Sequence, residues 1–470
     1  MVQLWQRSAS ELAQLIASKE VTSKEVIEAH LARIDAVNPK VNAIVRVLAD
    51  AARAGAALAD QAVALGKPLG PLHGVPFTIK ECIDMAGLPT TWGSPALAGA
   101  VVPLDAPVVQ RMRAAGAIPI GRTNLPDMGL RHSTDSSLYG VTRNPWKLQR
   151  TAGGSSGGEA VALATGMSPV GLGNDLGGSL RVPANFCGIA SIRPSAGRVP
   201  DAGFVPVEDH LLALQLMLVV GPMARRVADV RLGLQVLMGA HPRDPWSISA
   251  PLVGPALGRP IRVAVVAAPP GGSCDPVVSG VVRRAADALA NAGYDVVDVC
   301  PPRYEEVVAT FWRLVVGDFA SVMDKILPMI GEGGKALWAA VSAPVQPLSS
   351  VAEMSQLLIL RDGLGRAWSQ FMAEHPLVLT PTCTQLPFEQ GSDAATPAGA
   401  MAAKEMVRPC FPANLLGLPS ACVPAGRDDT TGLPIGVLLT GQRFREDLCL
   451  DAAEAVEGRL RVETPIEPIA

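Results

Sequence analysis

The sequence predicts an α/β protein in which helices are layered on a mixed, partly parallel β-sheet. Helix-like and strand-like apolar patterns alternate along the chain of 470 residues, which is typical of this class. Residues 260–266, 277–292 and 295–299 read as strand, helix and strand, a unit that resembles a βαβ crossover with parallel strands. The composition permits a large core, because 49% of the residues are hydrophobic and only 18% are charged.

Two capping boxes predict helices at the start of the chain. Ser8 with Glu11, and Thr22 with Glu25, match the pattern in which side chains satisfy the first amides of a helix. Apolar residues at helical spacing follow each box. A third, alanine-rich helix is predicted over residues 47–64, so residues 1–70 form an N-terminal helical segment.

The predicted sheet begins beyond this segment, and its elements alternate to the end of the chain. Residues 304–368, between the βαβ unit and the last strands, are predicted to be mostly helical. No internal repeat or low-complexity linker is apparent, which predicts one domain over residues 1–470. The other predicted elements are strands at 74–83, 117–121, 169–173, 377–381 and 436–439, and helices at 105–115, 161–165, 227–238 and 448–456.

Composition excludes several classes of function. The net charge of −3, without a basic stripe, argues against nucleic acid as a partner. The eight cysteines form no C-x-x-C and no Cys/His cluster, so we expect reduced thiols, no metal and no cofactor. The start of the chain does not resemble a signal peptide, and the apolar run at 211–220 is too short to span a bilayer. These features predict a cytoplasmic protein without a membrane partner.

The segment 151–200 contains two serines embedded in glycines, Ser155 and Ser179. Glycine permits tight turns and lets a substrate carbonyl approach main-chain amides. An apolar, helix-like stretch joins the two clusters, and Asp175 and Arg181 lie beside the second. This pattern indicates a catalytic site rather than a flexible linker.

A serine hydroxyl becomes a good nucleophile only when a base removes its proton. The six histidines form no motif, whereas Lys80 ends an apolar strand. Burial lowers a lysine pKa by up to about 3–5 units, so Lys80 is a candidate base with Ser155 as the bridging hydroxyl. Residues 153–157 also match G-x-S-x-G, but the polar, proline-containing residues 144–150 do not predict the strand that a nucleophile elbow needs.

Several ordered motifs resemble the amidase signature family of hydrolases. The resemblance covers roughly residues 11–457. The matching stretches are GVPFTIK (74–80), GRTNLP (121–126), RNPW (143–146), GGSSGG (153–158), DLGGSLRVP (175–183), FCG (186–188), NLLGLP (414–419) and GLPIG (432–436).

The resemblance implies a large mixed sheet with helices on both faces and a Ser–cisSer–Lys triad. Ser179 is implied as nucleophile, Ser155 as the serine after a cis peptide bond and Lys80 as base, within a catalytic core segment at 71–200. The implied oxyanion hole consists of the amides of Leu176, Gly177, Gly178 and Ser179. The residues implied to support the triad and its loop are Ser156, Asp175, Arg181 and Gly154.

The substrate pocket is expected to involve Met128, Gly129, Leu130, Arg131, His132 and Cys383. A variable region at about 304–400 is expected to shape it.

The implied activity is hydrolysis of C–N bonds in small aryl or alkyl amides, with esters, hydrazides and carbamates as related substrates. The implied mechanism is acyl transfer, and a homodimer is the favoured assembly. Three alternatives remain: a glutaminase component of a tRNA-dependent amidotransferase, a non-catalytic binding protein with this fold, and an α/β-hydrolase esterase that uses a histidine such as His375.

Overall fold

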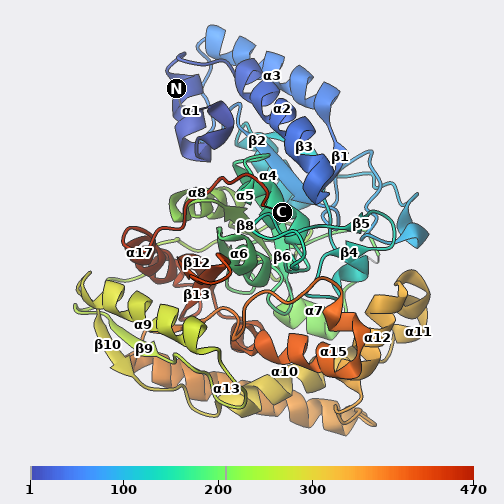
Figure 1. Cartoon of the computed structure of the whole chain (residues 1–470), viewed down its shortest axis with the longest axis vertical. Coiled ribbons are helices and arrows are strands. Elements are labelled where there is room, and N and C mark those ends of the chain that lie inside the picture. Colours follow the sequence, from blue (N-terminus) through green and yellow to red (C-terminus); the bar gives the residue numbers. More distant parts are fainter. Residues whose placement is uncertain (1–2, 207–208, 470) are drawn as a thin grey trace.

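One β-sheet of eleven strands runs through the computed structural model, which describes residues 3–206 and 209–469 (Figure 1). A separate pair of short strands, β4 (Asp135–Ser136) and β5 (Gly140–Val141), lies outside it. The sheet order is β1 (Ile44–Val47), β3 (Ile118–Thr123), β2 (Pro76–Lys80), β6 (Val170–Asp175), β8 (Val219–Ala224), β7 (Ala190–Arg193), β12 (Ser420–Arg427), β13 (Pro434–Gly441), β11 (Leu377–Pro381), β9 (Arg262–Val265) and β10 (Asp295–Asp298).

The sheet is mixed, as the sequence predicts. Strand β2 runs parallel to both of its neighbours, β3 and β6. Strand β9 is parallel to β10 and β11, and α9 (Pro276–Ala290) connects β9 to β10. The predicted βαβ crossover is therefore confirmed, while the remaining strand pairs of the sheet are antiparallel.

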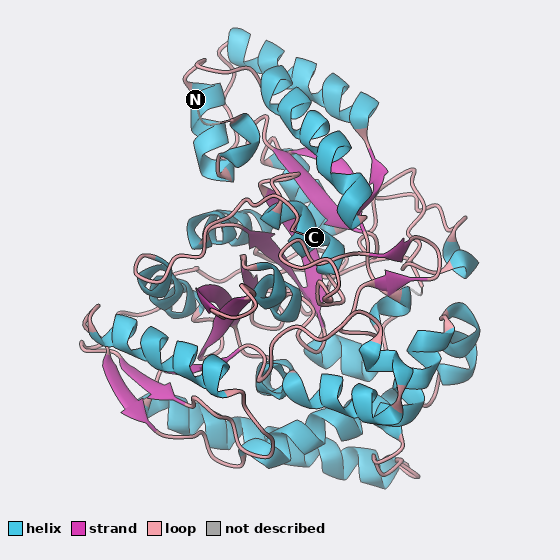
Figure 2. Cartoon of the chain, in the orientation of Figure 1, coloured by secondary structure: helices cyan, strands magenta, loops and turns pink. Residues whose placement is uncertain are grey.

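Helices cover both faces of the sheet, because its strands are apolar on both sides (Figure 2). Val263 and Val265 of β9 pack into one core, and Ala264 between them packs into the other. Helices α1 (Ala9–Ala17), α4 (Pro107–Ala114), α8 (Val227–Leu237), α9 and α17 (Glu446–Glu457) contribute to the first core. The second core receives α2 (Ser23–Val41), α3 (Ala49–Ala64), α5 (Gly157–Ala164), α6 (Arg181–Cys187), α7 (Leu212–Met217), α10 (Tyr304–Phe319), α13 (Val351–Glu374) and α16 (Phe411–Leu416).

Helices α10 and α13 of the second core are joined by further, shorter helices at the α7 and α10 end of the molecule (Figure 1). This region confirms the mostly helical prediction for residues 304–368. Besides α10 and α13 it contains α11 (Met323–Ile326), α12 (Glu332–Ser342), α14 (Ser392–Ala395) and α15 (Pro397–Met406).

Both capping boxes form: the side chains of Ser8 and Thr22 accept hydrogen bonds from the amides of Glu11 and Glu25. Several boundaries differ from prediction. Residue 47 belongs to β1, and the third helix begins at Ala49. Strands β7, β8 and β12 were not predicted. In β8 and β12 the apolar residues do not alternate with polar ones, because both faces of these strands are largely buried. Strand β7 does alternate, but it is only four residues long and its polar residues are buried as well.

The helix predicted over residues 161–165 begins earlier, at Gly157. Its glycines allow close packing: a Cβ at Gly158 would lie 2.4 Å from the backbone nitrogen of Asn124. The apolar run at 211–220 is divided between α7 and β8. In the described ranges, no helix combines the length and hydropathy needed to cross a bilayer.

Candidate functional site

Two parallel strands bring the predicted base and the predicted nucleophile loop to the same edge of the sheet. Strand β2 ends at Lys80, and its parallel neighbour β6 ends at Asp175, just before Ser179. Helix α5, which follows Ser155 and Ser156, packs on both strands. Three segments far apart in the sequence therefore converge.

Lys80 is fully buried and hydrogen-bonded. Its Nζ lies 2.7 Å from Ser155 Oγ and 2.6 Å from Asn174 Oδ1. Burial lowers the pKa of Lys80 to about 8, although the negative charges of Asp175 and Glu159 favour the ammonium form. The neutral amine is thus populated near neutral pH, as a general base requires.

Asn174 was not predicted as a site residue. It precedes Asp175 at the end of a strand that is otherwise apolar or glycine, and this polar pair was the available signal. Its contact with Lys80 depends on the parallel pairing of β2 with β6, which local sequence does not specify.

Ser155 and Ser179 are both almost buried, with exposed fractions of 3% and 7%. The Gly154–Ser155 peptide bond is cis. A Cβ at Gly154 would lie 2.6 Å from the Arg131 carbonyl oxygen, so this position requires glycine. No strand directly precedes Ser155, which removes the basis for a nucleophile elbow.

The two serine hydroxyls are not hydrogen-bonded to each other within the described structure, but both residues line one cavity. Ser156 makes hydrogen bonds near both serines: its amide donates to the Ser179 carbonyl at 3.3 Å, and its hydroxyl donates to the Asn174 carbonyl at 3.4 Å.

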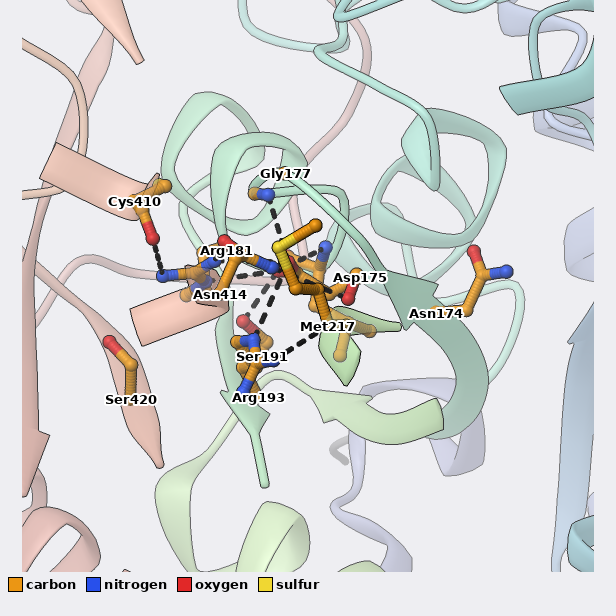
Figure 3. Close-up of polar contacts among 12 residues, drawn as sticks. Asn174, Asp175, Gly177, Arg181, Ser191, Arg193, Met217, Cys410, Asn414 and Ser420 are labelled. Carbon is orange, nitrogen blue, oxygen red and sulfur yellow. Dashed lines mark hydrogen bonds and ion pairs between the residues drawn. The ribbon is translucent and has the colours of Figure 1, made fainter. Parts of the chain in front are cut away.

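The Asp175 carboxylate organises the loop that carries Ser179 (Figure 3). It accepts hydrogen bonds from the amides of Gly178 at 2.8 Å and Leu180 at 3.1 Å. Arg181 Nε and Nη2 each donate to it at 2.9 Å, and Asn414 Nδ2 donates at 2.8 Å. Burial opposes ionisation, but the Arg181 charge and these donors hold the pKa of Asp175 well below its usual range. Asp175 and Arg181, both predicted as supporting residues, therefore form an ion pair.

This arrangement bears on the predicted oxyanion hole. The Gly178 amide is already committed to Asp175. The amides of Leu176, Gly177 and Ser179 donate to no protein acceptor in the described parts of the chain, so they are available to a substrate oxygen.

His132 contacts the same loop from the other side. Its Nε2 donates to the Gly177 carbonyl at 3.0 Å, and burial lowers the pKa of His132, so the ring is neutral at physiological pH. The loop is thus fixed from both sides.

A buried carboxyl group that was not predicted lies in α5, next to the strand that carries Lys80. Glu159 accepts hydrogen bonds from the hydroxyls of Thr78 and, at 2.7 Å, Thr123. Burial raises the pKa of Glu159 to about 7, against the effect of these hydrogen bonds. Its only signal in the sequence is an acidic residue within an otherwise apolar helix.

Two cavities meet at Ser179, and they share Gly129, Leu130 and Leu176 as walls. We call the smaller one, with about 680 Å³ of atom-free space, the aromatic cavity. The second, with about 1350 Å³, is called the long cavity. The other residues of the aromatic cavity are Arg131, His132, Gly177, Phe311, Trp312, Val315, Leu337, Trp338, Val341, Lys404 and Phe411. Those of the long cavity include Trp92, Met128, Ser155, Asn174, Leu214, Phe319, Lys325, Ile326 and Met329.

The five predicted pocket residues from Met128 to His132 lie on these walls. Cys383 does not: it is buried and lines neither cavity, so its placement in the pocket is corrected. Its burial in the second core explains this position. Lys404 and Phe411 were missed, because α15 and α16 approach the site only through the tertiary fold.

Comparison with known proteins decides the family. The sequence model of the Amidase family matches residues 25–450. The chain belongs to the amidase family. This amidase is 42% identical to indoleacetamide hydrolase of Bradyrhizobium diazoefficiens, over 98% of its own length and 87% of the relative's. It is 35% identical to a glutamyl-tRNA(Gln) amidotransferase subunit of Synechococcus sp. (strain WH7803), over 95% of its own length and 96% of the relative's.

Solved structures of the family share the fold of this amidase. A bacterial aryl acylamidase is 29% identical with a TM-score of 0.82, over 98% of this chain and 97% of that one. A 6-aminohexanoate cyclic dimer hydrolase is 28% identical with a TM-score of 0.84, over 98% of each chain. The amidase is a hydrolase that cleaves the carbon–nitrogen bonds of amides.

Proposed function

We propose that the amidase hydrolyses small aryl or alkyl amides through an acyl-enzyme on Ser179, with Ser155 and Lys80 as its proton relay. The observation that carries this proposal is the 2.7 Å contact between Lys80 Nζ and Ser155 Oγ at a fully buried lysine. A buried amine that is partly neutral can accept a proton, and its hydrogen bond to Ser155 provides the route.

In the proposed reaction, neutral Lys80 takes the proton of Ser155, and Ser155 takes that of Ser179 as Ser179 attacks the amide carbonyl. The amides of Leu176, Gly177 and Ser179 stabilise the negative charge on the tetrahedral intermediate. The proton then returns through the relay to the leaving nitrogen. Water, activated by the same groups, hydrolyses the acyl-enzyme and restores Ser179.

The walls of the aromatic cavity support an aryl group as one arm of the substrate. Phe311 and Phe411 stack with their ring centroids 4.5 Å apart, and Trp312 meets Phe411 edge-on. Two relatives, an indoleacetamide hydrolase and an aryl acylamidase, carry names that describe amides with aromatic groups. Esters, hydrazides and carbamates are further candidate substrates, because the same nucleophile can attack their carbonyls.

The test replaces the assigned groups one at a time. Ser179→Ala and Lys80→Ala are each expected to lower kcat/KM for an aryl amide by at least about a thousandfold, because the members of a relay act together. Ser369→Ala, on the exposed surface of α13, is the matched control and retains activity. Thermal unfolding checks that each variant is folded. Undiminished turnover by purified Ser179→Ala protein refutes the assigned nucleophile.

A second candidate function follows from the amidotransferase relatives, which the chain matches over nearly its whole length. As a component of such an enzyme, the protein would release ammonia from glutamine for a partner. Glutaminase activity that rises on addition of partner proteins and charged tRNA would favour this function. A folded protein whose Ser179 is not labelled by a fluorophosphonate probe would instead favour a non-catalytic binding role.

A further inference from the structure

The aromatic cavity contains a buried cation that has no acidic partner in the part of the chain that the structure describes. Lys404, on α15, is only 7% exposed and lines this cavity. Its Nζ makes one long hydrogen bond, 3.4 Å, to the Val341 carbonyl and lies 4.4 Å from the centroid of the Trp312 ring. The neighbouring acid, Glu405, is paired with Arg408, and no ion pair of the described residues includes Lys404.

The other basic side chains of the cavity already have hydrogen-bond partners. Arg131 donates to Asp393 at 2.9 and 3.0 Å and to Asp135 at 3.0 Å, so its guanidinium is engaged by two carboxylates. His132 is neutral and hydrogen-bonded to Gly177. Among the described residues that line the cavity there is no carboxylate. Among the described residues, Lys404 is therefore the cation of this cavity that has no carboxylate bonded to it.

Trp312 supplies a second unused donor. Its indole Nε1 is buried and has no hydrogen-bond acceptor among the described residues. Leaving a buried ammonium with a single long hydrogen bond, and a buried N–H group with no acceptor, costs free energy. A ligand that brings an acceptor into the cavity recovers this cost, whereas a purely apolar ligand does not.

We infer that Lys404, with Trp312, selects substrates whose aryl arm carries a carboxylate. The inference rests on the proposed function, because it assigns the aromatic cavity to one arm of the amide that Ser179 attacks. The ring of that arm packs against Phe311 and Phe411, and its carboxylate accepts hydrogen bonds from the ammonium and the indole N–H. Lys404 is thus a specificity-determining residue.

Two pairs of matched amides test the inference, one for each arm of the substrate. The first pair is para-carboxyphenylacetamide and para-methylphenylacetamide; the second is para-acetamidobenzoate and para-methylacetanilide. We expect the wild type to favour the carboxylate in one pair by at least about tenfold in kcat/KM, since a hydrogen bond to a charged group typically has this effect. That pair identifies the arm which occupies the aromatic cavity.

Lys404→Met keeps the length of the side chain and removes its charge, and is expected to lower the preference at least about tenfold. Lys404→Arg is expected to retain it. Trp312→Phe, which removes the indole N–H together with the five-membered ring that carries it, should reduce it less. The matched control is Lys335→Met on α12, because Lys335 is 40% exposed, is paired with Glu332 and does not line the cavity. Equal ratios in the wild type and Lys404→Met for both pairs would overturn the inference.

A binding measurement separates this inference from the proposed function. Calorimetry with Ser179→Ala and the double variant Ser179→Ala/Lys404→Met measures the affinity for the carboxylated and methyl amides without turnover. The preference for the carboxylate should be present in the first protein and lost in the second. If the wild type hydrolyses none of the four test amides, the proposed function is refuted but the role of Lys404 in binding is not. If the ratio of affinities for the carboxylated and methyl amides is the same in both variants, the role of Lys404 is refuted.

Discussion

Lys80 has Asn174 as its second hydrogen-bond partner, and the neutrality of this partner sets the pH range in which Lys80 can act as a base. An amide oxygen holds the amine in place without adding a full negative charge. Burial is therefore the dominant influence and brings the pKa of Lys80 to about 8. A carboxylate at the same position would favour the ammonium form instead.

The variant Asn174→Asp tests this reasoning. Activity depends on the neutral amine, so kcat/KM of the wild type should rise with pH through a pKa of about 8. A carboxylate in contact with Lys80 raises that pKa by about 1–3 units, so the rising limb moves to higher pH and activity at pH 7 falls at least about tenfold. The pH–rate profile measures both effects. Asn291→Asp, at the exposed end of α9, is the control, and an unmoved limb in Asn174→Asp contradicts the assignment.

Asp175 stabilises the folded loop that carries Ser179 and takes no part in the proposed reaction. In Asp175→Asn, the fully buried Arg181 loses its ionic partner, which typically costs about 3–5 kcal/mol. Folding lowers the pKa of Asp175, so its stabilisation is present above the ordinary carboxyl pKa of about 3.9 and is lost as the pH falls through the lower, folded value.

Thermal unfolding at pH 7 measures the stability lost in Asp175→Asn, with Asp451→Asn as the matched control. Asp451 is half-exposed and pairs with Arg231 on the surface, where removing one partner costs about 0–1 kcal/mol. Equal destabilisation by both substitutions would contradict the role given to Asp175.

At the scale of elements, α5 can lie close to the sheet because its first two residues are glycines without side chains. At Gly158, a Cβ would approach Asn124 and the Ala43 carbonyl, which lies 2.7 Å away. Because these contacts are backbone atoms, they cannot rotate aside. Ser155 and Ser156 directly precede this helix, so its closeness to the sheet places Ser155 beside Lys80.

Gly158→Ala is expected to destabilise the fold by about 1–3 kcal/mol or more, as overpacking does, and to lower activity by displacing α5. Gly365→Ala in α13 is the matched control, since no atom lies within 4 Å of its added Cβ. Alanine is the better helix former, so this control should gain about 0.5–1 kcal/mol. Thermal unfolding compares the two, and a stabilised Gly158→Ala protein would contradict the packing argument.

Local sequence was informative for elements with one buried face or a clear cap, and less so for the centre of the sheet. The helix α9 was found because Val278, Val281 and Leu289 share one apolar face. Strand β8, buried on both sides, offers no such alternation. At the site, the motifs indicated Ser155, Ser179 and Lys80. Asn174 and Lys404 could not be inferred, since their contacts arise from strand pairing and from the packing of α15.

At the scale of the whole molecule, the end of the chain returns to the N-terminal helices and the site segment (Figure 1). The Ile466 amide donates to the Ala164 carbonyl at 2.9 Å, at the end of α5. Arg33 of α2 donates to Glu467 at 2.6 Å and to the Ile466 carbonyl at 3.1 Å. Val462 is buried with Trp146. These contacts tie the last residues to α2 and α5.

A variant that ends at Leu460 loses all of these contacts. We expect it to be destabilised by at least about 2 kcal/mol, because a buried valine and several hydrogen bonds are removed. Glu467→Gln is the control: Glu467 is 67% exposed, and its ion pair alone should contribute about 1 kcal/mol or less. Thermal unfolding measures both, and a wild-type melting temperature for the shortened chain would contradict this account.

The meeting of two cavities at Ser179 has a kinetic consequence for the proposed chemistry. The amine half of the substrate can diffuse away through one cavity while the acyl half still occupies the other. The carboxylic acid is then the last product to dissociate, and it competes with fresh substrate for the empty enzyme. The amine, released earlier, rebinds to the covalent intermediate, so it inhibits without competing.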